Sequence, residues 1–196
     1  MNATATATVN TSAASNYDEA ADYIWNNSFD KPTLVVSRAR VGVQYDALQA
    51  GLGDARIHYA VKANPAPEII RMLVERGSGF DAASRQEIEL CLSQGADPAK
   101  ISFGNTIKRG VDIAFAHSIG VTMFAADCEA ELDKIAEHAP GARVYIRLIV
   151  ENSMADWPLT RKFGCAGSLL PSLLEYTKSV GLVPYGLSFH VGSQTR

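Results

Sequence analysis

The stretch RIHYAVKANPAPEII, residues 56–70, combines the signals of one strand-turn-helix unit. Its first half is apolar and rich in β-branched and aromatic residues, which predicts a buried strand over Arg56–Ala63. Asn64-Pro65 then interrupts the chain, and Pro65–Arg76 has the apolar spacing of an amphipathic helix. Lys62 therefore stands at the carboxyl end of a buried strand, where the chain turns into a helix.

The same pattern repeats along the rest of the chain. Further strands are predicted at Gly79–Ala83, Ile101–Asn105, Val121–Asp127, Arg143–Val150 and Val183–Val191. Further helices are predicted at Arg85–Ser93, Lys108–Ser118, Glu129–His138 and Ser168–Val180. Strands that alternate with helices indicate an α/β protein with a parallel sheet, which is either an open doubly wound sheet or a closed (β/α)8 barrel of the TIM type.

Two observations favour the barrel. Polar residues follow the strands at their carboxyl ends, the face where barrel enzymes build their sites: Lys62, Asp81, Asn105, Asp127, Arg147 and His190. No GxGxxG motif opens any of these helices. Because a barrel needs eight strands in about 250 residues, we expect residues 56–196 to form an incomplete barrel of about six βα units.

The amino-terminal part has a different character. Residues 1–30 are predicted to form a flexible tail and then a helix within NYDEAADYIWNN, residues 16–27. KPTLVVSRARV, residues 31–41, predicts a strand entered through Pro32, and residues 31–55 lead from it into the barrel. The first residues lack the basic and apolar regions of a secretory signal, and no apolar run approaches the about 20 residues of a membrane span. We therefore expect a cytoplasmic protein.

The bulk composition favours a small-molecule ligand. The chain has 196 residues, 47% of them hydrophobic, and a formal net charge of -3. Its acidic and basic residues are interspersed, which does not favour nucleic acid or an anionic membrane as a partner. Cys91, Cys128 and Cys165 are odd in number and widely spaced, so we expect reduced cysteines in the core rather than a disulfide or zinc framework.

Lys62 and the segment LSFHVGSQ, residues 187–194, carry the clearest chemistry. A lysine at the mouth of an apolar strand is partly desolvated, which favours the neutral amine that forms a Schiff base with an aldehyde. A lysine that merely reaches solvent from a strand end is the alternative. A neutral His190 could stack on a flat ring, and Ser193 could hydrogen-bond a phosphate oxygen. A buried structural histidine is the alternative there.

Three further charged residues belong to the predicted barrel. Asp81 ends the second strand, and Glu87 lies in the helix that follows it. Arg147 is flanked by apolar residues in the fifth strand, so it must face a carboxylate or another anionic oxygen. A purely structural ion pair between Arg147 and Asp81 is the alternative. In the loop WPLTRKFGC, residues 157–165, Arg161 and Lys162 could simply be solvated.

Five blocks, in order, resemble a known family: YAVKANPAPEII, GFDAASRQEIE, ISFGNTIK, DWPLTRKFG and LSFHVGSQ. They resemble the pyridoxal-phosphate-dependent basic amino acid decarboxylases of the alanine-racemase-like fold, most closely ornithine and lysine/ornithine decarboxylases. The resemblance runs from about Lys31 to the last residue, and it implies pyridoxal 5'-phosphate as cofactor and decarboxylation of ornithine, or lysine, to putrescine or cadaverine. Diaminopimelate decarboxylase and a catalytically inactive regulator on the same barrel are the alternatives.

The resemblance also implies roles for individual residues. Lys62 would bind the cofactor covalently, His190 would stack on its ring, and Ser193 would hydrogen-bond its phosphate. Asp81 and Arg147 would line the barrel around the cofactor. Two residues would lie further out: Glu87 in the same network, and Lys162 near the interface of a head-to-tail homodimer.

The chain also departs from the family. The glycine-rich phosphate loop, the acidic partner of the ring nitrogen, the partner-subunit cysteine and the carboxy-terminal β-domain have no counterpart in these 196 residues. We therefore expect this chain to be an amino-terminal portion that is inactive and poorly soluble by itself. Ser37 stands where an aspartate is expected.

Overall fold

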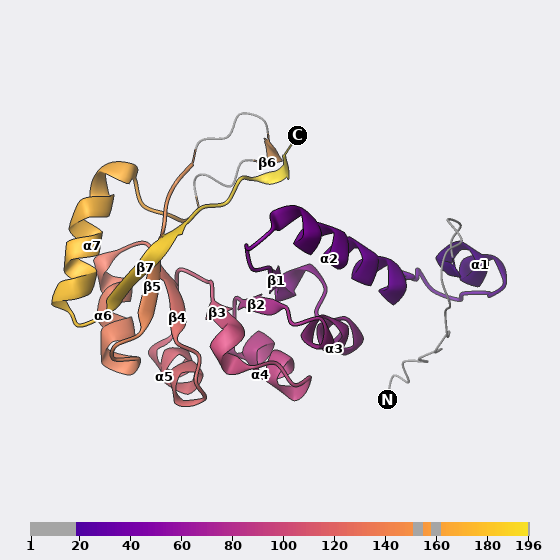
Figure 1. Ribbon diagram of the computed structural model, residues 1–196, viewed down its shortest axis with the longest axis horizontal. Coiled ribbons are helices and arrows are strands. Elements are labelled where there is room, and N and C mark those ends of the chain that lie inside the picture. The colour runs from indigo at the N-terminus through magenta and orange to yellow at the C-terminus, as the bar shows by residue number, and fades with distance from the viewer. Residues whose placement is uncertain (1–18, 151–154, 158–161, 196) are drawn as a thin grey trace. The chain divides into compact units, whose positions relative to one another are not determined.

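The computed structural model describes residues 19–150, 155–157 and 162–195, with the backbone alone at 155–157 and 193–195 (Figure 1). The chain divides into two compact units, Met1–Gly53 and Asp54–Arg196. The predicted amino-terminal tail lies outside the described residues.

The first unit contains two helices, α1 (Glu19–Trp25) and α2 (Arg38–Leu52). The helix predicted within residues 16–27 is confirmed, whereas the strand predicted at residues 31–41 is wrong. Residues 32–37 have no regular structure, and α2 begins directly after Ser37. The Ser37 hydroxyl accepts a hydrogen bond from the Arg40 backbone N–H at 3.3 Å, which caps the helix. Since aspartate and serine are both good caps, the departure at Ser37 keeps this function.

The second unit is built on a parallel sheet of six strands: β1 (His58–Ala60), β2 (Gly79–Ala82), β3 (Ile101–Phe103), β4 (Met123–Ala126), β5 (Arg143–Arg147) and β7 (Val183–Ser188). These are the six predicted strands, and the structure ends all six earlier than the sequence indicates. The strands lie in the sheet in the order in which they occur in the chain. A doubly wound sheet would reverse that order at its switch point, so the barrel prediction is confirmed over the open sheet.

Five helices connect these strands: α3 (Pro67–Glu75), α4 (Arg85–Ser93), α5 (Gly110–Ser118), α6 (Glu129–His138) and α7 (Leu170–Ser179). They lie in a row along one side of the curved sheet (Figure 1), as right-handed crossovers in one direction require. Short 3-10 helices occur at η1 (Val61–Ala63), η2 (Pro98–Lys100) and η3 (Gly167–Leu169). A separate antiparallel pair joins β6 (Ala155–Trp157) to β8 (Ser193–Thr195).

The core lies between the sheet and the helices. Apolar side chains of both layers are fully buried there, among them Phe80, Phe124, Ile113, Leu132 and Ile146. Of the three free cysteines, Cys91 and Cys165 are buried as predicted. Cys128 is exposed, so its assignment to the core is wrong: it occupies the residue before α6, where the chain leaves the sheet and turns outward. No helix in the described parts of the chain has the length and apolar character needed to cross a membrane.

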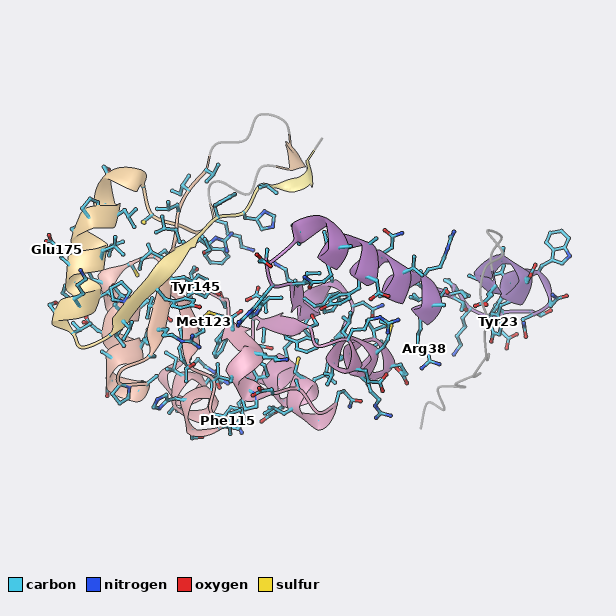
Figure 2. All side chains as sticks on the ribbon, viewed as in Figure 1. Tyr23, Arg38, Phe115, Met123, Tyr145 and Glu175 are labelled. Carbon is cyan, nitrogen blue, oxygen red and sulfur yellow. The ribbon has the colours of Figure 1, made fainter. Side chains whose placement is uncertain are left out.

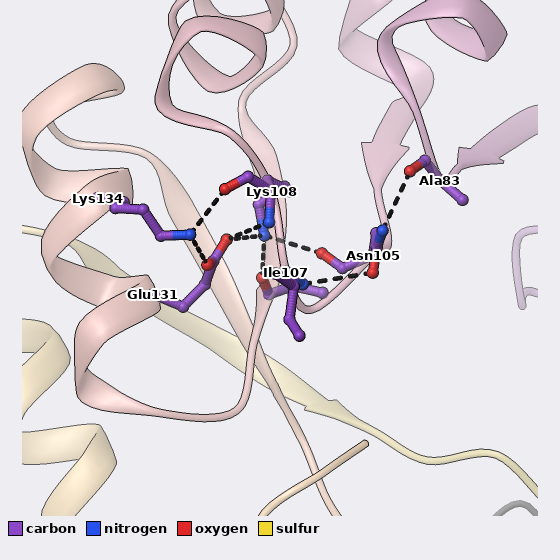
Figure 3. A network of polar contacts seen from close by, with 7 residues as sticks. Ala83, Asn105, Ile107, Lys108, Glu131 and Lys134 are labelled. Carbon is purple, nitrogen blue, oxygen red and sulfur yellow. Dashed lines mark hydrogen bonds and ion pairs between the residues drawn. The ribbon is translucent and has the colours of Figure 1, made fainter. Parts of the chain in front are cut away.

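A buried ion pair between Lys108 and Glu131 joins the segment before α5 to α6 (Figure 3). The Lys108 ammonium lies 2.8 Å from Glu131 Oε1, and both side chains are at most 2% exposed. Lys108 Nζ also donates to the backbone oxygens of Asn105 and Ala125, at 2.9 and 2.6 Å. Lys134 approaches the second Glu131 oxygen at 2.5 Å. Burial lowers the pKa of Lys108, and Glu131 opposes that shift. The pair joins the segment before α5 to α6, and the Lys108–Ala125 hydrogen bond joins that segment to β4.

Candidate active site

A pocket of about 470 Å³ lies against the strands of the barrel wall. That volume is within the range of pockets that hold small molecules and cofactors. Met123 and Tyr145, labelled in Figure 2, belong to the neighbouring strands β4 and β5 in its lining. The pocket is lined by His58, Lys62, Asp81, Ser102, Gly104, Met123, Tyr145, Arg147, Tyr185, Gly186, Leu187, Ser188, Phe189 and His190. The structure thus brings together four of the predicted site residues, Lys62, Asp81, Arg147 and His190.

Lys62 reaches the pocket from η1, the 3-10 turn that ends β1. Val61 before it is fully buried, whereas Lys62 is exposed. The expected desolvation of this lysine is therefore wrong, because the strand ends at Ala60 and the turn lifts the side chain out of the apolar layer. Asn64 Oδ1 accepts from the Ala66 N–H at 3.1 Å and closes the turn before α3. The amine of Lys62 is thus accessible to a ligand in the pocket.

Asp81 is held in one orientation by its neighbours on β3. The Ser102 hydroxyl donates to Asp81 Oδ1 at 2.8 Å. Gly104 leaves the space that the carboxyl group fills, since a Cβ atom there would lie 1.9 Å from Asp81 Oδ1. Partial burial raises the pKa of Asp81, while the Ser102 hydrogen bond and then the charges of Lys62 and His58 lower it.

Arg147 has no carboxylate partner among the described residues. The alternative of a structural ion pair with Asp81 is wrong, because no ion pair joins the two within the part of the chain that the structure describes. The guanidinium carbon instead lies 5.4 Å from the centre of the Phe163 ring. The expectation that Arg147 faces an anionic oxygen is not met within the described protein, which leaves its charge available to a ligand.

His190 follows β7 and faces the pocket. The Gly192 backbone N–H donates to its Nδ1 at 2.8 Å, so the neutral ring carries its proton on Nε2. Partial burial lowers the pKa of His190, and the positive charges of Arg147 and Lys62 act in the same direction. The ring is therefore neutral near pH 7, as a side chain that stacks on a flat ligand requires. Ser193 begins β8, and its side chain lies outside the described part of the chain.

Glu87 and Lys162 do not line the pocket. Glu87 accepts a hydrogen bond from the Ala83 N–H, and the Ser84 hydroxyl accepts from the Glu87 N–H at 3.3 Å. This arrangement resembles a capping box and starts α4, so Glu87 touches the site only through its charge, which raises the pKa of Asp81. Lys162 is exposed, with Nζ 5.5 Å from the centre of the Phe163 ring.

Five polar residues of the pocket are absent from the sequence-based prediction: His58, Ser102, Tyr145, Tyr185 and Ser188. Three of them lie an even number of residues before a predicted site residue at the end of the same strand: His58 before Lys62, Tyr145 before Arg147 and Ser188 before His190. Side chains on a strand alternate between its two faces. That period of two is the signal that could have found these three.

Residues 38–196 match the family described as "Pyridoxal-dependent decarboxylase, pyridoxal binding domain". The chain belongs to this family. Pyridoxal 5'-phosphate is the cofactor of these decarboxylases, and that prediction is confirmed at the level of the family.

Individual relatives agree with this assignment. "Decarboxylase flvG" of Aspergillus flavus is 38% identical over 172 residues, and the match covers 88% of this chain and 40% of that protein. A lysine/ornithine decarboxylase of Selenomonas ruminantium is 37% identical, with 84% of this chain and 42% of the relative covered. Antizyme inhibitor 2 of Xenopus laevis is 38% identical, over 69% of this chain and 30% of its own length. This chain thus spans well under half the length of these relatives.

The solved structures show the same fold. The crystal structure of an SrLDC mutant in complex with PLP superposes with a TM-score of 0.84 at 34% sequence identity. That superposition covers 92% of this chain and 47% of the other chain. The six-stranded unit of this chain therefore has the fold of part of that structure.

The residues present in the pocket fit the family's cofactor. Lys62 supplies a primary amine that can bond to the cofactor's aldehyde, and His190 supplies a neutral, flat ring. Among the described lining residues, Asp81 is the one carboxylate, whereas Lys62 and Arg147 are two cations. This surplus of positive charge suits an anionic phosphate-bearing cofactor.

Proposed function

We propose that this chain is the cofactor-binding portion of a decarboxylase that acts on ornithine or lysine. The observation that carries the proposal is the gathering of Lys62, His190 and Arg147 in one pocket, with no carboxylate paired to Arg147 in the described residues. Family membership and the relative named as a lysine/ornithine decarboxylase support the same reading.

The pocket residues have different roles in this proposal, according to their chemistry. When bound, pyridoxal phosphate supplies an electron sink for the pair of electrons left behind as carbon dioxide departs. Lys62 would hold the cofactor through its primary amine and could hold or release a proton at Nζ. His190 would support the ring, and Arg147 would attract anionic oxygens. Ser193 follows closely in sequence, and we assign it to the cofactor phosphate.

The positive charge of Lys62 lowers the pKa of Asp81, so we assign Asp81 to balancing the charge at Lys62. Ser102 holds Asp81 in the lining of the pocket, and we assign the distal end of the substrate to other groups. The choice between ornithine and lysine is therefore assigned to residues outside those described here.

Three further properties belong to the proposal. We place the protein in the cytoplasm and propose a head-to-tail homodimer for the whole enzyme. The exposed Lys162, beside Phe163, is the candidate interface residue on this chain. Glu87 acts indirectly, by fixing the start of α4 behind Asp81.

Trapping the lysine-bound cofactor tests the central assignment. After incubation with pyridoxal phosphate and borohydride reduction, peptide mass spectrometry should find the adduct on Lys62. Lys62→Arg keeps the charge and should abolish it, whereas Lys100→Arg, an exposed lysine on η2, should not change it. An adduct that is spread equally over surface lysines would contradict the proposal.

The full-length protein tests the reaction. Carbon dioxide release and diamine formation should be measured with ornithine, lysine and diaminopimelate at equal concentrations. Turnover of ornithine or lysine is expected. Preference for diaminopimelate would favour that decarboxylase, and adduct formation without turnover of any substrate would favour an inactive regulator.

A further inference from the structure

The wall of the pocket contains polar side chains that the proposed function leaves without a role. Ser102 is only 4% exposed, yet its hydroxyl points at Asp81 Oδ1 at 2.8 Å, whereas the Phe80 carbonyl oxygen lies at 3.4 Å. Tyr145 lines the same pocket from β5. It interacts with the Ser102 hydroxyl and with the charge of Asp81.

The Ser102 proton fixes the direction of the hydrogen bond with Asp81. A serine hydroxyl carries a single proton. Ser102 gives that proton to Asp81 Oδ1 at 2.8 Å. This is the carboxyl oxygen that lies nearest to the position of a Cβ atom at Gly104.

The strand register explains why this hydrogen bond can form. Asp81 and Ser102 are directly paired on β2 and β3, so their side chains leave the sheet on the same face. Tyr145 is paired with Ala125 on the intervening strand β4.

We propose that Ser102 is a positioning residue that holds the Asp81 carboxyl group in the orientation that supports Lys62, in a wall of the pocket that it shares with Tyr145. This inference rests on the proposed function of Lys62. The other groups that face Asp81 are Lys62 from η1, His58 from β1 and Glu87 from α4. Tyr145 additionally faces Arg147.

A pH titration of the lysine-bound cofactor tests the inference in the full-length protein that contains this chain. The absorbance of the cofactor on Lys62 reports whether the Lys62 nitrogen carries its proton. Ser102→Ala removes the hydrogen bond that holds the Asp81 carboxylate in its place in the pocket, so the midpoint of the absorbance change should fall by about half a unit to one unit. Tyr145→Phe removes a hydroxyl group from the same pocket without removing that hydrogen bond, and should lower the midpoint by less. Ser102→Thr, which keeps the hydroxyl, should restore it.

Two controls separate positioning from a general effect on the fold. Tyr176→Phe also removes a tyrosine hydroxyl that donates to a carboxylate, Asp133 at 2.7 Å, but outside the pocket, and should leave the midpoint unchanged. In the Asp81→Asn background, Ser102→Ala should have no further effect, because Ser102 acts through the carboxylate.

Each result has one meaning. Unchanged midpoints in Ser102→Ala and Tyr145→Phe, or an equal shift by Ser102→Ala in the Asp81→Asn background, would overturn this inference alone. If the wild-type protein shows no lysine-bound cofactor, or if Lys62→Ala keeps its absorbance, the proposed function fails and this inference with it.

Discussion

Gly104 shows how much a single missing side chain can matter to the pocket. In Gly104→Ala the new Cβ would lie 1.9 Å from Asp81 Oδ1, so the carboxyl group must leave its place beside Ser102. We expect the affinity for pyridoxal phosphate, measured by absorbance titration, to fall on the order of tenfold, the equivalent of about one lost hydrogen bond to a charged group.

A second glycine provides the control for that substitution. Gly51 lies within α2, and a Cβ atom there meets nothing within 4 Å. Gly51→Ala should stabilise the protein by about 0.5–1 kcal/mol in denaturant unfolding and leave cofactor affinity unchanged. Equal affinities in Gly104→Ala and wild type would show that the position of Asp81 is unimportant.

His190 should show an unusual titration in NMR spectra of its imidazole. Burial and the charges of Arg147 and Lys62 lower its pKa, so its midpoint should lie below the ordinary value of about 6.5. Because the unfolded chain takes up this proton at higher pH, His190 reduces the free energy of unfolding as the pH falls below about 6.5.

Removing the charge of Lys62 tests whether nearby positive charge lowers the pKa of His190. Lys62→Met should raise the pKa of His190 toward its ordinary value, whereas Lys178→Met, an exposed change on α7, should not. A midpoint at or above 6.5 in the wild type would contradict the described environment of the ring.

At the same scale, the sequence predicts the charged residues of the pocket and misses the polar ones. Lys62, Asp81, Arg147 and His190 stand at or near strand ends, where a charge in an apolar run is conspicuous. Ser102 and Tyr145 look like ordinary strand residues, and their contact with Asp81 depends on a register between strands that no local pattern contains.

Among the elements, the connection between α5 and α6 depends on the buried pair Lys108–Glu131. Lys108→Met leaves the Glu131 carboxylate buried with Lys134 as its remaining ion-pair partner, and should lower the free energy of unfolding by about 3–5 kcal/mol. The double variant Lys108→Met/Glu131→Leu should lose less than Lys108→Met, because no uncompensated charge remains. Denaturant titration measures both.

The exposed pair Arg85–Glu89 is the matched control. Its side chains are 41% and 46% exposed, so Glu89→Gln should change the free energy of unfolding by less than about 1 kcal/mol. A Lys108→Met protein as stable as Glu89→Gln would show that the buried pair does not hold α5 and α6 in place.

Element boundaries were predicted best for two helices of the second unit. α4 and α6 begin and end at the predicted residues, and α4 starts at the capping arrangement of Ser84 and Glu87. The strand predicted at residues 31–41 is wrong for a different reason. Its β-branched residues suggest a strand, but among the described residues no neighbouring strand pairs with it, and Ser37 starts a helix instead.

For the molecule as a whole, β7 is one end of the described six-stranded sheet, and its apolar side chains are exposed. Three of its side chains, Val183, Tyr185 and Leu187, are 47–56% exposed. Beyond the strand, Phe189 is 60% exposed and Val191 is 48% exposed. An apolar strand at a sheet edge pairs readily with other chains. The 196-residue polypeptide should therefore self-associate at micromolar concentration in sedimentation velocity experiments.

Charge placed on that strand should reduce the association. Val183→Lys is expected to shift the sedimentation profile toward the monomer. Val111→Lys, at a 66% exposed position on α5, adds the same charge away from the strand and should not. Equal effects of both substitutions would mean that net charge, rather than the edge of β7, controls association.

The barrel architecture could be predicted at this scale because it follows from a local repeat. The pattern of each βα unit can be recognised within about 20–30 residues of sequence. Units that follow one another in the chain then lie side by side in the sheet.

The unequal environments of the three cysteines have a practical consequence. Cys91 is buried, and burial raises its pKa to about 12, while Cys165 is buried beside β5. Cys128 is exposed at the start of α6, two residues beyond the last residue of β4. At neutral pH a maleimide dye or spin label should therefore react at this one natural position, which offers a spectroscopic reporter on the barrel wall without any engineered cysteine.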